Sequence, residues 1–303
     1  MQGKKILVTG LTGQVGKPVA KILARQNEIW GLARFSDPSK KLELEQAGIR
    51  CVAADLVRGD FSAVPTDFDY VLNFAVYRGE AGSFDEDITA NAEAAGLLMA
   101  HCRKARAFLH CSTTGVYNPQ GQKRLKETDD LGDHHKVMLK TYSITKIATE
   151  AVVRTMARHL GLPAIIGRLN VPYGDNGGWP LAHLTMMKHG MAIPVHPNKP
   201  GLYTMIHEED IARTIPALLG AATVPARIVN WGHQDTVSVE EWCAYLGELT
   251  GLVPKFNYTD QTIESAAADV SQLIALAGPM QVGWKEGLRR MVRTHHPDWL
   301  VTA

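Results

Sequence analysis

A glycine-rich turn directly after the first strand-like run is the feature that most restricts the fold of this chain. The run Lys5–Thr9 is short and apolar, and Gly10, Gly13 and Gly16 follow it before a helical pattern begins. Gly10 permits a tight turn, Gly13 lets the backbone approach a pyrophosphate, and Gly16 allows close packing of helix on strand. The helix N-terminus that follows attracts negative charge. Strand, turn and helix predict a dinucleotide site, although the spacing is GxxGxxG rather than GxGxxG; a glycine-rich turn without a ligand is the alternative.

A tyrosine and a lysine four residues apart supply the second constraint. Tyr142 and Lys146 lie one turn apart on the same face if this stretch is helical. A nearby ammonium group favours the phenolate and lowers a tyrosine pKa from about 10 toward neutrality. Tyr142 is therefore a candidate acid or base for moving a proton on or off a carbinol oxygen. On its own this spacing is more often a solvated surface pair, so the assignment depends on the rest of the chain.

Strand-like and helical runs alternate through the first half of the chain. Helical stretches such as Asn91–Lys104 and Tyr142–His159 separate most of the strand-like runs. Such alternation predicts an α/β fold with a Rossmann-type, doubly wound parallel sheet that is covered on both faces. The expected strands are Lys5–Thr9, Glu28–Ala33, Arg50–Ala53, Tyr70–Phe74, Ala107–Cys111 and Ala164–Arg168, with Arg227–Asn230 as one more.

Composition excludes several classes of partner. The chain has 303 residues, 45% of them hydrophobic, and a net charge of +1, so it can bury a substantial core and offers no basis for a nucleic-acid or membrane partner. Four scattered cysteines, no signal peptide and no apolar run of spanning length predict a cytoplasmic protein. The pairs His134-His135 and His295-His296 lack metal-ligand spacing, so loop positions and no metal site are expected. The expected partner is a small-molecule substrate, and a homodimer is left open.

Several motifs in order resemble the extended branch of the short-chain dehydrogenase/reductase superfamily, which holds NAD(P)-dependent epimerases, dehydratases and reductases. The resemblance covers most of the chain. The matching segments are Thr9–Gly16, Ala54-Asp55-Leu56, Asn73-Phe74-Ala75, Asn91 with Gly96, Ser112–Tyr117, and Tyr142 with Lys146. The resemblance implies a Rossmann domain of residues 1–169 with a return segment of about 204–235. Residues 170–203 and 236–303 would form a smaller C-terminal substrate-binding lobe.

The resemblance also implies roles for individual residues. Tyr142 would exchange a proton with the substrate oxygen, Lys146 would lower the pKa of Tyr142 and hold the nicotinamide ribose, and Thr113 would hydrogen-bond the same substrate oxygen. Thr113 has an alternative role as a strand-end hydroxyl that satisfies a backbone group, and Asn91 has a structural alternative. The expected cofactor-binding residues are Gly10, Thr12, Gly13, Gln14, Val15, Gly16, Arg34, Asp55, Leu56, Phe74, Ala75, Asn91, Tyr142, Lys146 and Asn170.

The end of the second strand bears on the choice of cofactor. Members of the family that use NAD carry an acidic residue there, which bonds the ribose 2′-hydroxyl. This chain has Ala33 followed by Arg34, and a guanidinium can pair with a 2′-phosphate. NADP(H) is therefore favoured over NAD(H), while Asp37 nearby keeps NAD(H) as the alternative.

The substrate is expected to be small and hydrophobic. Tyr203 stands where sugar-nucleotide enzymes of the family carry a diphosphate-binding arginine. The expected pocket residues are Val76, Tyr77, Tyr117, Trp179 and Met205, which suit a carbonyl or alcohol. The main hypothesis is thus hydride transfer between a nicotinamide cofactor and such a substrate. A sugar-nucleotide epimerase or dehydratase is the alternative, and a non-catalytic dinucleotide-sensing regulator is the second alternative.

Overall fold

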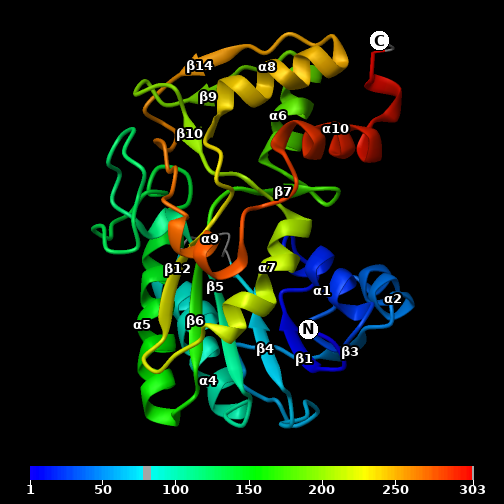
Figure 1. The fold of residues 1–303 in the computed structure, drawn as a ribbon, viewed down its shortest axis with the longest axis vertical. Helices are drawn as coiled ribbons and strands as arrows, with labels where there is room; N and C mark the ends of the chain where they lie inside the picture. Colours follow the sequence, from blue (N-terminus) through cyan, green and yellow to red (C-terminus); the bar gives the residue numbers. More distant parts are fainter. Residues whose placement is uncertain (78–82, 302–303) are drawn as a thin grey trace.

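A seven-stranded parallel sheet forms the larger lobe of the computed structural model, which describes residues 1–77 and 83–301 (Figure 1). The strand order is β12-β6-β5-β4-β1-β2-β3, and every neighbouring pair is parallel. The doubly wound fold and its expected strands are therefore confirmed. The strands are β1 Lys5–Thr9, β2 Glu28–Ala33, β3 Arg50–Ala53, β4 Tyr70–Asn73, β5 Ala107–Thr113, β6 Ala164–Leu169 and β12 Arg227–Trp231.

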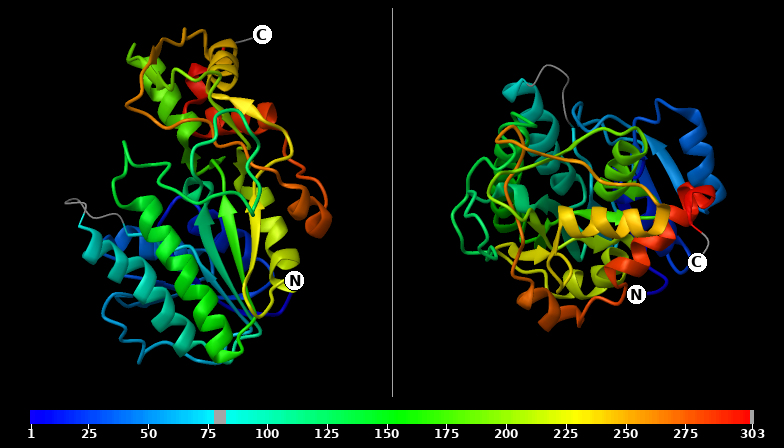
Figure 2. Two further views of the ribbon diagram at one scale, coloured as in Figure 1. Left: turned by 90° about the vertical axis from the view of Figure 1, so that its left-hand side faces the viewer. Right: turned by 90° about the horizontal axis from the view of Figure 1, so that it is seen from above.

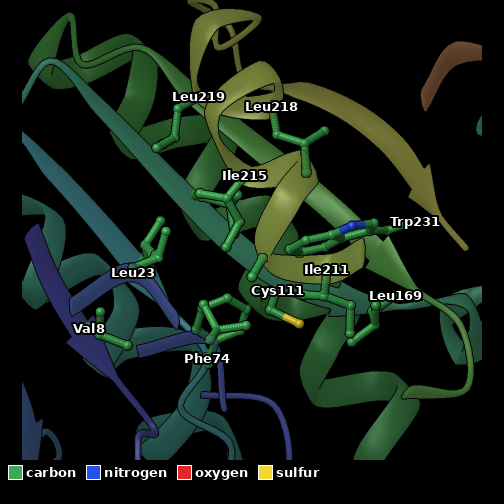
Figure 3. Packing of buried hydrophobic residues seen from close by; sticks show 14 of the residues in the cluster. Val8, Leu23, Phe74, Cys111, Leu169, Ile211, Ile215, Leu218, Leu219 and Trp231 are labelled. Atoms are coloured by element: carbon green, nitrogen blue, oxygen red, sulfur yellow. The ribbon is translucent and has the colours of Figure 1, made fainter. Parts of the chain in front are cut away.

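Helices cover both faces of this sheet because successive strand side chains point to opposite sides. In β5, Phe108 packs in the cluster with α4 and α5, whereas Leu109 packs in the cluster with α1 and α7. Figure 3 shows the second cluster, in which α7 brings Ile211 and Ile215 against Leu23 and Trp231. The helices are α1 Gly16–Ala24, α2 Pro38–Gln46, α3 Phe84–Ile88, α4 Ala94–His101, α5 Tyr142–Leu160 and α7 Glu208–Gly220, with a π-helical turn η1 at Thr89–Glu93 and a 3-10 turn η2 at Thr114–Val116.

The smaller lobe lies above the sheet, beyond the carboxyl ends of its strands (Figures 1 and 2). Its core gathers Trp242 and Leu246 of α8 with Leu288 and Met291 of α10. A capping box starts α8, as its sequence predicts: the Glu241 amide donates to Ser238 Oγ at 3.1 Å, and the Ser238 amide donates to Glu241 Oε2 at 2.8 Å. The elements here are β7 Pro172–Gly174, β8 Gly177–Gly178, α6 Trp179–Lys188, β9 Ile193–Val195, β10 Leu202–Tyr203, β11 Ile206–His207, β13 Val237–Ser238, α8 Val239–Thr250, β14 Phe256–Tyr258, α10 Trp284–His295 and η3 Pro297–Trp299.

The chain passes between the two lobes more than once. It leaves the sheet after β6, forms β7 to β11, and returns through α7 to add β12 at the sheet edge. After α8 and β14 it returns again as α9 (Ser271–Ala277), whose Leu273 packs with Trp231 in the sheet cluster. The stretch around α9 lies within residues 236–303, which the sequence assigns to the small lobe, yet its apolar residues pack on the sheet.

Three further properties bear on chemistry. No helix among residues 1–77 and 83–301 is long and apolar enough to cross a membrane. No group of three or more His, Cys, Asp or Glu in these residues could hold a metal ion. The four cysteines are free thiols, and burial raises the pKa of Cys102 to about 12.

Candidate active site

A large cavity of about 880 Å³ lies between the sheet and the small lobe. Its floor follows the carboxyl ends of β1, β4, β5 and β6, where ligands bind in open α/β sheets. Most of the expected site residues line it together. They are Gly10, Thr12, Gly13, Gln14, Val15, Gly16, Arg34, Phe74, Val76, Tyr77, Thr113, Tyr142, Lys146, Asn170 and Trp179.

The glycine turn has the geometry that its sequence predicts. Gly10 has a φ of +68°, and a Cβ there would lie 2.6 Å from the backbone of Phe74. A Cβ on Gly16 would lie 2.4 Å from the Gly10 carbonyl oxygen. The residue before α1 is Val15, which makes no side-chain cap, so the first amides of the helix face the cavity turn without a capping group. This cradle fits a dinucleotide pyrophosphate.

Thr113, Tyr142 and Lys146 line the same cavity. Tyr142 is the first residue of α5, and Lys146 follows one turn later with its Nζ 6.0 Å from the Tyr142 ring centroid. Lys146 is 4% exposed, and its Nζ donates to the Cys111 carbonyl oxygen at 2.9 Å. Thr113 ends β5 and its Oγ1 accepts from the Gly115 amide at 3.0 Å. The Thr113 hydroxyl is an acceptor in that bond, so its proton is directed elsewhere.

A buried ion pair fixes α5 to the sheet beside this centre. Glu150 lies one turn beyond Lys146 and accepts two bonds from Arg168 of β6, at 2.7 and 3.0 Å. Their side chains are 4% and 3% exposed. Ser112 Oγ also donates to Glu150 at 2.6 Å. The pair thus joins the helix that carries Tyr142 to two central strands.

A smaller hollow of about 90 Å³ adjoins the cavity at the end of β2. Arg34, Ser36 and Lys40 line it, together with Asp37. The Asp37 carboxylate caps α2, where it accepts from Ser39 Oγ at 2.6 Å and from the Ser39 amide at 3.0 Å. These bonds lower the pKa of Asp37. Oδ1 of the carboxylate therefore caps the helix, and two cationic side chains border the hollow.

Two of the expected pocket residues, Tyr117 and Met205, do not line the cavity. Tyr117 is fully buried, its hydroxyl donates to Asn230 Oδ1 at 2.6 Å, and the Arg168 guanidinium lies 4.8 Å from its ring centroid. Met205 is 1% exposed and packs in the core of the small lobe. Both are apolar or aromatic residues that the sequence cannot separate from cavity residues, and neither lines the cavity.

Several of the expected cofactor residues also lie outside the lining. Asn91 holds the segment after β4: it accepts from the Tyr77 amide at 2.8 Å and donates to the Tyr77 and Asp87 carbonyl oxygens. The Ala75 amide donates to Thr9 Oγ1 at 3.2 Å, a bond that ties the segment after β4 to β1. Asp55 and Leu56 do not line the cavity either, and Asp55 Oδ1 accepts from the Val57 amide.

Asn170 lines the cavity but its amide group already has protein partners. Its Nδ2 donates to Thr114 Oγ1 at 3.0 Å and to the Ala266 carbonyl oxygen at 2.7 Å. Its Oδ1 accepts from the Thr204 amide at 3.0 Å. These bonds tie three segments together at the edge of the cavity.

The cavity also contains residues that the sequence did not point to. The His134-His135 pair occupies a loop, as expected, but His135 lines the cavity and His134 is 4% exposed. Met138 and Leu139 from the same loop contribute as well, and so do Ile263 and Ala266 from the small-lobe side. No motif marks these positions, because they come from loops. Tyr203 of β10, at the position where the sequence resemblance implies a diphosphate-binding arginine in sugar-nucleotide enzymes, also lines the cavity.

A hairpin of the small lobe closes on the glycine turn. Asn176, between β7 and β8, donates from Nδ2 to the Gln14 carbonyl oxygen at 2.9 Å. The Asn176 amide donates to Glu208 Oε2 at 3.0 Å, at the start of α7. Burial raises the pKa of Glu208 to about 7. The hairpin therefore holds the glycine turn through a direct side-chain bond.

A family model for the NAD dependent epimerase/dehydratase family matches residues 6–232, a span that includes the glycine turn, Thr113 and the Tyr142–Lys146 pair. The chain belongs to this family. Its members are enzymes of the short-chain dehydrogenase/reductase type, so this epimerase/dehydratase family protein is an NAD(P)-dependent enzyme with the Rossmann fold. A comparison with curated proteins found no match.

Solved structures of similar fold include sugar-nucleotide enzymes. The UDP-glucuronic acid 4-epimerase from Bacillus cereus, in complex with UDP-glucuronic acid and NAD, is 20% identical with a TM-score of 0.82, over 96% of this chain and 98% of that one. MoeE5 in complex with UDP-glucose and NAD is 22% identical with a TM-score of 0.81, over 97% and 99%. The dTDP-glucose 4,6-dehydratase DesIV from Streptomyces venezuelae is 18% identical with a TM-score of 0.81, over 97% of each. At these identities the likeness establishes the fold of this family protein.

Proposed function

We propose that this protein is an NAD(P)-dependent oxidoreductase that transfers a hydride between its nicotinamide cofactor and a small, mainly hydrophobic carbonyl or alcohol. The observation that carries the proposal is the lining of the substrate end of the cavity, defined here as Val76, Tyr77, His135, Met138, Leu139, Trp179, Tyr203, Ile263 and Ala266. Among the described lining residues, the lysines and arginines are Lys146, beside Tyr142, and Arg34, at the glycine-turn end. An apolar ketone gains about 25 cal/mol per Å² of buried area in such a lining.

The chain supplies placement and proton transfer. Tyr142 gives a proton to the substrate oxygen during reduction and takes it back during oxidation, with Thr113 donating its remaining hydroxyl hydrogen bond to the same oxygen. The charge of Lys146, one turn away, favours the phenolate and faces the ribose side of the site. When bound, the nicotinamide supplies or accepts the hydride. The glycine cradle and the hairpin that carries Asn176 hold the pyrophosphate region in register with these groups.

NADP(H) is the preferred cofactor in this proposal. Arg34 and Lys40 border the hollow at the end of β2, where a 2′-phosphate would sit, and Asp37 is bound to Ser39. The solved structures named above that contain a dinucleotide contain NAD, so this preference would distinguish the chain from them. Arg34→Glu should move the ratio of kcat/KM for NADPH over NADH by about ten-fold or more toward NADH, because a charge-assisted bond contributes about 1.5–3 kcal/mol. The exposed Arg25, which lies outside the lining, is the matched control.

A sugar-nucleotide epimerase or dehydratase is the second candidate. The family model and the complexes of UDP-sugars in proteins of the same fold favour it. The substrate end opposes it, because its described residues carry no arginine that would offset the desolvation of a diphosphate. A non-catalytic regulator is disfavoured, because the chain has both Tyr142 and Lys146 and brings them to one cavity with Thr113.

A titration of the cofactor-loaded enzyme separates these candidates. UDP, a UDP-sugar and a series of hydrophobic ketones are added in turn, with binding followed by calorimetry and turnover by nicotinamide absorbance. The oxidoreductase proposal expects turnover of ketones that disappears in Tyr142→Phe, and weak binding of UDP. Micromolar binding of UDP without turnover of any ketone would overturn it in favour of the sugar-nucleotide enzyme.

A further inference from the structure

His135 packs against Tyr142 and lies beside Gly115, next to the Thr113 hydroxyl. Its ring lies edge-on to the Tyr142 ring, with centroids 5.2 Å apart and an interplanar angle of 73°. On its other side the ring fills the space of an absent side chain: a Cβ on Gly115 would lie 2.2 Å from His135 Nδ1 and Cε1, and 3.3 Å from Thr113 Oγ1. The imidazole thus enters the cavity at the junction of Tyr142 and Thr113.

The loop that carries His135 is anchored on both sides of the ring. His134 Nε2 donates to the Glu264 carbonyl oxygen of the small lobe at 3.0 Å. The His135 amide donates to Ser143 Oγ at 3.2 Å, and the same oxygen lies 3.5 Å from His135 Nδ1. Ser143 is fully buried in the first turn of α5, so the anchor moves with Tyr142. Such anchoring fixes the orientation of the imidazole before a substrate arrives.

The side chains around the His135 ring are mainly apolar, so a polar group there can discriminate between substrates. Met138 and Leu139 follow it in the loop, and Ile263 and Ala266 face the cavity from the small lobe. In a mainly apolar cavity, a few fixed polar groups determine the orientation of the ligand. A site that hydrogen-bonds a substrate oxygen rejects analogues that lack it far more strongly than an apolar wall rejects an extra methylene group.

We propose that His135 is a specificity-determining residue that hydrogen-bonds a second oxygen of the substrate, on a carbon next to the one that Tyr142 and Thr113 serve. The preferred substrate is then a hydroxyketone, or the corresponding diol in the reverse direction, on an otherwise hydrophobic skeleton. This inference rests on the proposed oxidoreductase function and narrows its substrate class. His135 acts by binding the second oxygen, while Tyr142 remains the proton donor.

The test compares 2-hydroxycyclohexanone with cyclohexanone, two probes that differ by one hydroxyl group. The wild-type enzyme with NADPH or NADH should show a kcat/KM for the hydroxyketone about ten-fold or more above that for the ketone. In His135→Leu this ratio should fall close to one, and in His135→Gln, which keeps hydrogen-bonding atoms, it should stay between the two. His189→Leu, at an exposed histidine outside the cavity, should leave the ratio at the wild-type value.

Gly115→Ala provides an independent route if His135→Leu does not fold. The new methyl group must displace the imidazole without removing it, so the ratio should fall toward one in this variant as well. Turnover of both probes with the same ratio in the wild type and in the folded variants would overturn the role of His135 and leave the oxidoreductase proposal standing. Turnover of neither probe, with either cofactor, would overturn the oxidoreductase proposal and this inference with it.

Discussion

Replacement of Glu150 by alanine should destabilise the protein strongly, although Glu150 touches neither the cofactor turn nor the substrate end. The variant leaves the Arg168 guanidinium buried, at 3% exposure, without its bidentate partner at 2.7 and 3.0 Å. It also removes the acceptor of the Ser112 hydroxyl. Removal of one partner from a buried ion pair costs about 3–5 kcal/mol in the free energy of unfolding, mostly because the remaining charge is uncompensated.

The double variant Glu150→Leu with Arg168→Met isolates this cause. It removes both charges and keeps apolar volume, so it should be less destabilised than Glu150→Ala alone. Arg106→Ala is the matched control: its Nε lies 3.0 Å from Asp69 Oδ1, a similar distance, but the Arg106 side chain is 65% exposed. Loss of that exposed pair should cost no more than about 1 kcal/mol.

The measurement is urea unfolding followed by circular dichroism, with midpoints compared at a common slope. A Glu150→Ala variant that loses no more stability than Arg106→Ala would refute the argument. The double variant would also refute it if its loss of stability equalled the sum of the losses in Glu150→Leu alone and Arg168→Met alone, since the two charges would then not be coupled.

Three further predictions concern the site. Tyr142→Phe should abolish turnover and leave dinucleotide affinity nearly intact; retention of more than a tenth of the wild-type rate would remove Tyr142 from proton transfer. Lys146→Ala should lower both turnover and dinucleotide affinity, and an unchanged Kd by calorimetry would contradict a contact with the ribose. Burial raises the pKa of Glu208 from 4.5 to about 7, so folding favours its protonated form, and stability is lost as the pH rises between these values. Glu208→Gln should therefore unfold at a higher temperature than the wild type at pH 8 and at a similar temperature at pH 4; the same difference at both pH values would show that ionisation is not the cause.

The sequence predicts the sheet well because the short apolar runs that favour strands locally are also the residues that the sheet buries. The strand bounds of β1, β2 and β3 match the expected runs, and β5 and β6 extend one or two residues further. Buried parallel strands appear in the sequence as short apolar runs. The glycine turn after β1 identifies that strand as the start of a strand–turn–helix unit that binds dinucleotides. An apolar run does not reveal which lobe it packs against, as α9 shows: its apolar residues lie within the expected small-lobe span but join the sheet cluster, through tertiary packing that periodicity does not encode.

The site is predictable where backbone geometry demands a residue and unpredictable where a loop supplies it. Gly10 and Gly16 are required because a Cβ would overlap the backbone, and their spacing reveals them. Tyr117 was expected in the pocket, but its hydroxyl finds Asn230 far along the chain and the ring is buried there. His135 lies in a loop, as expected, but the missing side chain of Gly115 leaves room for its ring beside the cavity. Neither outcome follows from the local sequence, because both depend on which distant residue shares the space.

The late addition of β12 has a consequence for the order in which the protein can be completed during synthesis. When β6 leaves the ribosome its outer edge has no neighbour, and the chain must still produce β7 to β11 and α7 before Arg227–Trp231 can pair with it. Trp231 then covers Gly167, where a Cβ would lie 2.5 Å from the indole ring. A nascent chain that ends before β12 therefore exposes both an unpaired strand edge and the apolar groove that Trp231 fills, which are the features that recruit other unfinished chains.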